Sequence, residues 1–401
     1  MTDAIKSTGV IGLGVMGFDI AFLYAQKGYR ALVYDAAEAA MKNVPARRDR
    51  TIERLQRRNR ITEAEAANVR NLLAAAPNLD SLCKTDLITE AVSESGETKR
   101  AVYRALRDGG FAGILTTNTS SLTRRSLLGD GDYANERFAT THFFNPVLYT
   151  QIVEVVKGDM SKENCTILTA FLADLGRKPV ETKDISGFVS NSVLMVYAVM
   201  ALRLIEAGAT IDAVDGAAKD IYALPPCLSY DSWKPSIVED VTQVMFDFRR
   251  DAYLRSSKLL TALAKSNPVF YVDQKPNSAI YMLAERGSRA PSREFIKLAL
   301  LTSVRTAAAR IVELGEAPAM ADFIATVGLK FPREPLAEID EMGAGAVLKD
   351  LRAVNETMPV NGLQAPALLT AMASEGQKFF QTGQANPWLA AHVEGKAHAS
   401  D

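Results

Sequence analysis

The sequence predicts a doubly wound α/β domain followed by an all-α part that contains two related helical domains. A glycine-rich turn near the N-terminus lies between two short apolar segments, as in a strand–turn–helix–strand unit. Short apolar strands then alternate with helical patterns. Beyond Gly187 the strand patterns almost vanish, and two helical stretches resemble each other. We therefore expect domains at residues 1–185, 186–288 and 289–401.

The glycine-rich turn has the G-x-G-x-x-G pattern of a dinucleotide-binding unit, formed by Gly12, Gly14 and Gly17. The first glycine makes a tight turn, the second lets the backbone approach a pyrophosphate, and the third lets the helix pack on the strand. Backbone N–H groups at the helix start, including those of Val15 and Met16, would hold the phosphates. The pattern predicts a Rossmann-type nucleotide-binding domain.

The second strand of this unit ends in an acidic residue, Asp35, eighteen residues after the last glycine. A lone glycine pattern occurs often by chance, but its place within strand, helix, strand and acid makes the prediction specific. A carboxylate at this position accepts the adenosine ribose hydroxyls and repels a 2′-phosphate. The expected cofactor is therefore NAD rather than NADP.

The remaining elements of the first domain follow in order. Residues 46–76 are expected to form a charged helical hairpin, with helices at 46–59 and 62–75, and the second helix opens with the capping box Thr62-x-x-Glu65. Further strands are expected at 86–92, 114–117, 138–143, 151–156 and 178–182, with a helix at 163–175. This alternation completes the doubly wound sheet.

The helical part begins with a long, mostly apolar helix at 188–207 that is expected to be buried on most sides. Its end, Leu204-Ile-Glu-Ala-Gly208, matches Ile311-Val-Glu-Leu-Gly315. The register continues without a gap and places Asp215 on Asp322, and Leu224-Pro225 on Phe331-Pro332. Such agreement indicates a duplication. Residues 252–290 are polar and loop-rich, and we expect them to connect the two copies.

Composition excludes several classes of protein. The 401 residues carry a net charge of −1 and are 48% hydrophobic, so the chain lacks the basic field that nucleic acid would attract. No apolar stretch could span a bilayer, and the N-terminus has no apolar signal segment. The three cysteines are widely spaced, which argues against disulfides and a zinc site. We expect a cytoplasmic protein without nucleic-acid, membrane or metal partners.

One histidine is placed for catalysis. His392 and His398 fall in a small, polar C-terminal tail that is expected to be frayed, whereas His142 ends an apolar run just before Asn145-Pro146. Imidazole has an ordinary pKa near neutrality, so it is the default general base. The alternative for a lone histidine on an apolar strand is a core residue with its hydrogen bonds satisfied.

Several polar motifs in the first 210 residues resemble, in order and spacing, those of the 3-hydroxyacyl-CoA dehydrogenase family. They are the glycine turn, Glu90-Ala-Val-x-Glu94-x4-Lys99, Thr117-Asn-Thr-Ser120-Ser-Leu122, His142-Phe-Phe-Asn145-Pro146, Glu154 in its apolar strand, and Gly187-Phe-Val-Ser-Asn191. In combination these motifs are highly specific. The C-terminal repeat resembles the family's helical domain, present twice as in multifunctional members.

The resemblance implies a role for each polar residue. His142 would be the base that takes the 3-hydroxyl proton of a (3S)-3-hydroxyacyl-CoA while hydride passes from C3 to the nicotinamide, and Glu154 would orient its ring. Ser120 would contact the substrate hydroxyl and the cofactor, and Asn191 would position the substrate's oxygens. The residues that match cofactor-binding positions are Glu94, Lys99 and Asn145. Taken singly, Ser120 could be a turn residue, Glu154 a surface acid and Asn191 a helix-start residue.

A row of arginines marks the first charged helix. Those spaced for one face are Arg47, Arg50, Arg54 and Arg58. Arginine forks suit phosphates, and in the family this hairpin grips coenzyme A, so Arg54 and Arg58 are expected to bind the CoA part of the substrate. The alternative is a solvated face stabilised by a Glu53–Arg57 pair.

The sequence departs from the family pattern in two places. Ser192 follows Asn191 where the family usually has arginine, and Pro226-Cys-Leu-Ser-Tyr-Asp-Ser-Trp233 replaces a Gly-Pro-Phe segment that borders the acyl pocket in relatives. Specificity for a fatty chain is therefore open. Two other functions also remain: a dehydrogenase of a free hydroxy acid of the gulonate or carnitine type, and a non-catalytic NAD-binding scaffold.

The repeat also predicts how the chain assembles. Single-copy relatives dimerise through the helical domain, and here the second copy could cover the first within one chain as an internal pseudo-dimer. The apolar residues of the second copy that could meet the long helix are Phe295, Leu298, Leu301 and Val304. The chain would then be a monomer or a homodimer.

Overall fold

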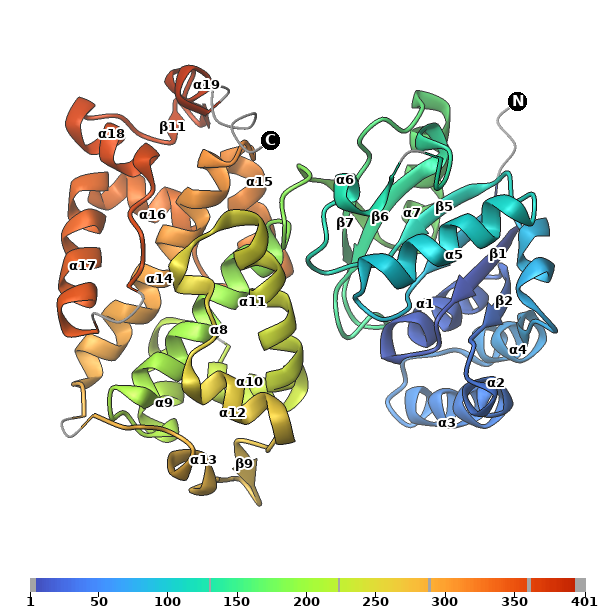
Figure 1. The fold of residues 1–401 in the computed structure, drawn as a ribbon, viewed down its shortest axis with the longest axis horizontal. Coiled ribbons are helices and arrows are strands. Elements are labelled where there is room, and N and C mark those ends of the chain that lie inside the picture. The colour runs from blue at the N-terminus through green and yellow to red at the C-terminus, as the bar shows by residue number, and fades with distance from the viewer. Residues whose placement is uncertain (1–4, 130, 223, 288–289, 359–361, 394–401) are drawn as a thin grey trace. The chain divides into compact units, whose positions relative to one another are not determined.

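The computed structural model describes residues 5–129, 131–222, 224–287, 290–358 and 362–393 (Figure 1). The chain divides into two compact units, Met1–Asp184 and Ile185–Asp401. No helix in the described ranges is both long and apolar enough to cross a membrane.

The first unit is built on an eight-stranded sheet with the order β3-β2-β1-β4-β5-β6-β7-β8. The strands are β1 (Ser7–Ile11), β2 (Arg30–Tyr34), β3 (Leu73–Ala75), β4 (Leu87–Glu90), β5 (Ile114–Thr117), β6 (Phe138–Phe143), β7 (Ile152–Val156) and β8 (Lys178–Glu181). All neighbours pair in parallel except β6 and β7, which are antiparallel. The predicted doubly wound sheet is confirmed. The carboxyl ends of β1, β4, β5 and β6 therefore lie along one edge.

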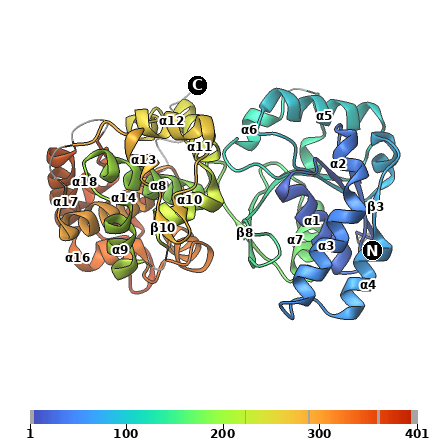
Figure 2. The ribbon, with the colours of Figure 1, turned by 90° about the horizontal axis from the view of Figure 1, so that it is seen from below.

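Helices connect these strands close to their predicted positions. They are α1 (Val15–Gln26), α2 (Glu38–Lys42), α3 (Val44–Gln56), α4 (Glu63–Leu72), α5 (Gly96–Asp108), α6 (Arg124–Leu127) and α7 (Lys162–Asp174). The helices α3 and α4 form the expected hairpin (Figure 2), with α4 packed against β2 and β3, and the Thr62–Glu65 capping box is present. The helix expected to reach residue 75 ends earlier, because Leu73–Ala75 pairs with β2 as an edge strand.

The second unit is helical. Its first part contains α8 (Ser190–Glu206), α9 (Ile211–Ile221), α10 (Pro226–Trp233), α11 (Pro235–Arg249), α12 (Lys258–Ser266) and α13 (Ala279–Met282). The later part contains α14 (Arg293–Glu313), α15 (Pro318–Phe323), a π-helical turn (Ile324–Gly328), α16 (Pro335–Met342), α17 (Ala344–Thr357), α18 (Ala367–Glu375) and α19 (Trp388–Val393). The longest helix, α14, packs along α8 and α9.

The same capping contacts occur in both halves of the second unit. Asp215 accepts the N–H groups of Cys227 and Leu228 at the start of α10. Asp322 accepts those of Leu336 and Ala337 at the start of α16. Likewise Asp231 accepts from Phe270 and Tyr271, and Asp340 from Phe379 and Phe380. These pairs support a duplicated fold.

The ungapped register predicted past Asp322 is wrong. Asp322 follows Asp215 by 107 positions, but Pro335 of α16 follows Pro226 of α10 by 109. The two extra residues fall in a stretch of the second half that contains a π-helical turn, in which Leu329 N donates to Ile324 O. The partner of Pro225 is therefore Glu334 and not Pro332.

The connection expected at 252–290 is wrong as well. This stretch forms a 3-10 turn (Ala252–Leu254), α12, a two-strand ribbon of β9 (Tyr271–Val272) and β10 (Lys275–Pro276), and α13. Leu259, Leu260 and Leu263 lie on one face of α12 and are fully buried. Their helical spacing after the N-cap Ser257 was the signal that the polar surroundings obscured.

The described part of the C-terminal tail, up to Val393, belongs to the helix α19. His392 lies on α19, where its ring stacks on Trp388 with a centroid distance of 3.6 Å and its Nδ1 lies 3.0 Å from Trp388 O. The prediction of a frayed segment is therefore wrong for His392. His398 lies outside the described residues.

Candidate active site

The glycine-rich turn joins β1 to α1 with the geometry that a dinucleotide needs. Gly12 has φ +93°, and a Cβ built there would lie 2.5 Å from Ala91 O. A Cβ on Gly17 would lie 1.9 Å from Gly12 O, so this position tolerates no side chain. A Cβ on Gly14 would meet nothing within 4 Å, and Gly14 caps α1 without a side-chain hydrogen bond. The absence of neighbouring atoms at Gly14 would let a pyrophosphate approach the N–H groups that begin α1.

Asp35 lies just beyond β2 and is already tied to this turn. Its carboxylate accepts Leu13 N at 2.6 Å and Ala37 N at 2.8 Å. Each carboxylate oxygen has a second lone pair, so both oxygens can still accept a ribose hydroxyl. The placement fits an adenosine ribose beside β2.

Arg47 on α3 holds the outer side of the turn. It donates to Leu13 O at 2.7 Å and to Gly14 O at 3.0 Å, and its guanidinium lies 4.1 Å from the Phe18 ring centroid. Arg47 therefore belongs to the glycine turn and not to the solvent-facing row in which its spacing placed it. The tie helps to keep the turn in one conformation.

The other members of the row lie toward solvent, since Arg50 and Arg54 on α3 and Arg58 just beyond its end are exposed. Burial raises the pKa of Asp19 on α1, and the positive charges of Arg47 and Arg54 act against that rise. Farther along, Arg58 Nη1 lies 3.4 Å from the hydroxyl of Tyr149, in the loop after β6. The row of arginines therefore runs from the neighbourhood of Asp19 on α1 to Tyr149 in the loop that follows His142. The Glu53–Arg57 pair also forms, at 3.7 Å between exposed side chains.

His142 and Glu154 face each other across the only antiparallel strand pair of the described sheet. They are directly opposite in the β6–β7 register, although twelve residues separate them in sequence. His142 Nδ1 lies 2.8 Å from Glu154 Oε2, and the two residues are 9% and 1% exposed. A buried carboxylate at Nδ1 favours the tautomer with its proton on that nitrogen, which leaves the lone pair on Nε2. The arrangement can accept a proton at Nε2.

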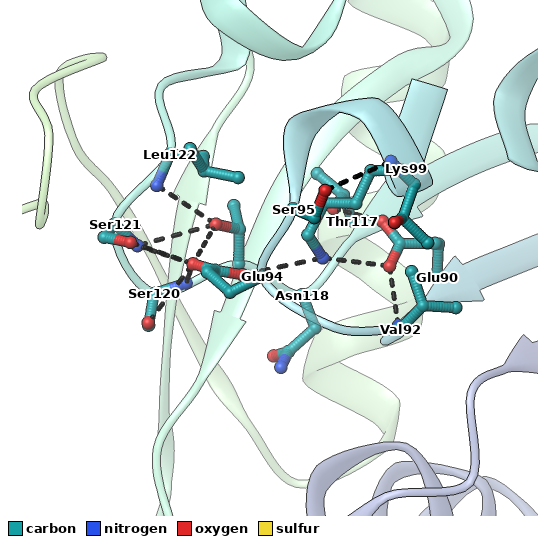
Figure 3. A network of polar contacts seen from close by, with 12 residues as sticks. Glu90, Val92, Glu94, Ser95, Lys99, Thr117, Asn118, Ser120, Ser121 and Leu122 are labelled. Atoms are coloured by element: carbon teal, nitrogen blue, oxygen red, sulfur yellow. Dashed lines mark hydrogen bonds and ion pairs between the residues drawn. The ribbon is translucent and has the colours of Figure 1, made fainter. Parts of the chain in front are cut away.

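Ser120 lies in the loop after β5, and Glu94 holds this loop (Figure 3). Glu94 Oε1 accepts Ser120 N at 2.8 Å, Ser121 N at 3.1 Å and Thr119 Oγ1 at 2.6 Å, and it lies 3.3 Å from Ser120 Oγ. Burial alone would raise the pKa of Glu94, but Lys99 and these hydrogen bonds hold it below its usual value. An ionised Glu94 therefore fixes the position of Ser120.

Lys99 is fully buried between two carboxylates. Its Nζ lies 2.9 Å from Glu90 Oε1 and 3.6 Å from Glu94 Oε2. Glu90 also accepts Val92 N at 2.7 Å, Tyr103 OH at 2.9 Å and Thr117 Oγ1 at 2.7 Å. Since Lys99 has no exposed side-chain surface, its effect on a ligand passes through Glu94.

Of the other predicted residues, Asn145 lies at the same edge and Asn191 in the second unit, and Asn118, which was not predicted, also lies at this edge. Asn145 is exposed two residues after β6. Asn118 joins the β5 and β6 ends, since its Oδ1 accepts Phe143 N at 3.0 Å. Asn191 lies in the first turn of α8, in the second unit, and is 9% exposed.

The roles of Glu90 and Asn118, and the contacts of Arg47 with the glycine turn, were not predicted from the sequence. Glu90 and Asn118 stand within the motifs already quoted, next to residues that were chosen. The signal for Glu90 was an acid at the end of an apolar strand, nine residues before Lys99. Nothing in the sequence distinguishes Arg47 from its neighbours on α3.

The family usually has an arginine at the position of Ser192. Here an arginine from another helix contacts Ser192. Arg249 of α11 donates to Ser192 Oγ and to Ser186 O, on either side of Asn191. Burial lowers the pKa of Arg249 to about 10, so it stays protonated at neutral pH. The turn that carries Asn191 therefore keeps a guanidinium beside it, supplied from another helix.

Comparison with known sequences identifies the family. The family model described as "3-hydroxyacyl-CoA dehydrogenase, NAD binding domain" matches residues 7–185, and the C-terminal domain of the same family matches residues 187–270. A 3-hydroxybutyryl-CoA dehydrogenase from Mycobacterium tuberculosis is 34% identical over 224 residues, which are 54% of this chain and 77% of that protein. A fatty acid oxidation complex subunit alpha from Pseudomonas syringae is 32% identical over 53% of this chain and 29% of its own length.

Solved structures agree with this result. The M. tuberculosis protein FadB2 is 28% identical with a TM-score of 0.63, covering 66% of this chain and 95% of that one. A 3-hydroxybutyryl-CoA dehydrogenase from Escherichia coli has a TM-score of 0.74 and covers 93% of this chain and 100% of that one. At 20% identity the second likeness shows the fold alone. The chain belongs to the 3-hydroxyacyl-CoA dehydrogenase family, whose members are oxidoreductases.

Proposed function

We propose that this protein oxidises the C3 hydroxyl of a (3S)-3-hydroxyacyl-CoA to the 3-oxoacyl-CoA, with NAD as cofactor and His142 as general base. The observation that carries the proposal is the buried His142–Glu154 pair at the carboxyl end of β6. This end lies on the same sheet edge as the glycine turn and the Ser120 loop. Ligands of doubly wound sheets bind beyond the carboxyl ends of the strands.

Residues of this chain would take up the proton that the substrate hydroxyl loses. Glu154 keeps the Nδ1 proton of His142 in place, so Nε2 accepts the proton of the substrate hydroxyl. The imidazolium that results is stabilised by the carboxylate 2.8 Å away. Ser120 Oγ would hold the same hydroxyl, and Asn191 would hold the substrate's oxygens. When bound, NAD supplies the hydride acceptor.

The acyl group is the part of the substrate that needs a direct test. A panel of short, long, branched and aryl 3-hydroxyacyl-CoAs, followed by NADH absorbance, would give kcat/KM for each. Turnover of at least one CoA thioester supports the proposal. Turnover of free hydroxy acids alone would favour a gulonate- or carnitine-type enzyme, and no turnover with intact NAD binding would favour a scaffold.

We also propose that Arg54, on α3, and Arg58, just beyond its end, bind the phosphates of coenzyme A. Arg54→Glu combined with Arg58→Glu should raise KM for the CoA thioester far more than KM for NAD. Each lost charge-assisted contact is worth about 1.5–3 kcal/mol, so the thioester KM should rise at least about tenfold. Steady-state kinetics with each substrate varied in turn measures both constants.

A matched control makes the same change in charge elsewhere on the hairpin. Arg57 and Arg70 pair with Glu53 and Glu63 and lie outside the row. The variant Arg57→Glu with Arg70→Glu should leave the thioester KM within about twofold of wild type, as expected for solvated ion pairs. Equal KM values for the CoA thioester in the wild type and the Arg54/Arg58 variant would show that these arginines are solvated and do not bind coenzyme A.

Asp35 is proposed to select NAD over NADP. Asp35→Ser should raise KM for NAD and reduce the preference in kcat/KM for NAD over NADP. The reason is that the carboxylate both accepts ribose hydroxyls and repels a 2′-phosphate. The ratio of kcat/KM for the two cofactors measures the effect. A wild-type enzyme that already prefers NADP would show that the role assigned to Asp35 is wrong.

A further inference from the structure

Two carboxylates share one ammonium group at the end of β4. Glu90 and Glu94 lie 2.9 and 3.6 Å from Lys99 Nζ, and in the described part of the chain no other lysine or arginine lies within ion-pair distance of either acid. The side chains of Glu90 and Lys99 are 0% exposed, whereas that of Glu94 is 23% exposed. The group therefore presents Glu94 toward its open side.

Both acids have the surroundings of ionised carboxylates. Glu90 accepts from Lys99, Val92 N, Tyr103 OH and Thr117 Oγ1, and the first two of these can only donate. Glu94 accepts two backbone N–H groups and is surrounded by hydroxyls. With both acids ionised and Lys99 protonated, the group carries one net negative charge.

The sheet order places this charge beside the second half of a bound dinucleotide. Asp35, beyond β2, lies on the adenosine side of β1, so the other nucleotide belongs on the opposite side, over β4 and β5. Glu90 ends β4, and Ser120 follows β5. The segment between Glu90 and Val92 also touches the glycine turn, since Ala91 O occupies the space that a Cβ on Gly12 would need.

We propose that Glu90, Lys99 and Glu94 act together as an electrostatic element that favours binding of the oxidised dinucleotide over the reduced one. The nicotinamide ring is cationic when oxidised and neutral when reduced, so a fixed negative charge stabilises only the oxidised form. Glu94 delivers most of the effect because it is the exposed member. Lys99 and Glu90 are positioning residues that hold it. The inference rests on the proposed function, which puts NAD at this edge.

The test compares the dissociation constants of NAD⁺ and NADH for the purified protein, by titration calorimetry. Glu94→Gln removes the net charge and should raise the ratio Kd(NAD⁺)/Kd(NADH) by roughly 3–10-fold, the effect of one partly screened charge. Lys99→Met makes the net charge −2 and should move the ratio in the opposite direction. Glu94→Gln combined with Lys99→Met restores −1, with Glu90 still held by three other donors, and should return the ratio toward wild type.

Glu97 provides the matched control. It is exposed on α5, the helix that carries Lys99, and follows Glu94 by three residues in sequence, so Glu97→Gln removes an equal charge without touching the group and should leave the ratio unchanged. A Glu94→Gln variant that weakens both dinucleotides equally would show that Glu94 acts only by holding the Ser120 loop, and would overturn the inference. A wild-type protein that binds neither dinucleotide would instead overturn the proposed function.

Discussion

Replacing His142 by glutamine is expected to lower kcat by about 10²–10⁴, which is the usual contribution of a general base. Glutamine fills a similar space but cannot take up a proton. The dissociation constant for NAD should stay nearly unchanged, because His142 lies on β6 and the glycine turn follows β1. Initial-rate assays of NADH formation give kcat, and titration with NAD gives the dissociation constant.

Two further variants delimit the result. Glu154→Gln should also lower kcat, because the amide can neither fix the Nδ1 proton as firmly nor balance an imidazolium. His392→Gln is the control, since His392 stacks on Trp388 in the helical unit and should not affect kcat. Near-normal turnover of His142→Gln would remove His142 from the mechanism.

The sequence was sufficient to predict the α/β unit because its signals are local. Apolar strands, a glycine turn and a capping box each depend on a few neighbouring residues, and all of them appear in the structure. The strand Leu73–Ala75 was not predicted, because it depends on pairing with a distant segment and not on neighbouring residues. It leaves the helical pattern to pair with Ala31–Val33 of β2, and this pairing overrides helix propensity.

The site was only partly predictable for the same reason. His142 and Glu154 could be named from their motifs, but their 2.8 Å contact depends on β6 and β7 being antiparallel neighbours in one register. Similarly, helical spacing places Arg47 with Arg54, yet only the fold shows that carbonyls of the glycine turn lie within its reach. The partner of a long side chain is a tertiary property.

The packing of α8 leads to the prediction with the largest effect on stability. Of its seventeen residues, all but Leu194 and Glu206 are buried, so the helix needs cover on every side. Helices α9, α10, α11 and α12, the 3-10 turn and the π-helical turn each supply part of that cover, and α14 makes the most extensive contact. The residues expected to meet α8 do join its apolar cluster, with Val304 fully buried and Phe295, Leu298 and Leu301 partly buried.

Truncation after Gly287 is therefore expected to give an insoluble or self-associating fragment. Each square ångström of apolar surface that α14 covers contributes about 25 cal/mol, so uncovering one long face of α8 costs more than a typical domain can lose. Residues 286 and 287 are kept because Arg286 donates to Gly208 O and Gly287 N to Glu206 O, which hold the end of α8. We propose that the second copy acts in this way as an internal partner, replacing a two-fold interface between chains. Light scattering on the full chain should give a discrete monomer or homodimer, and on the fragment a mixture of larger species. A soluble, monomeric and active fragment would show that α8 does not need the second copy.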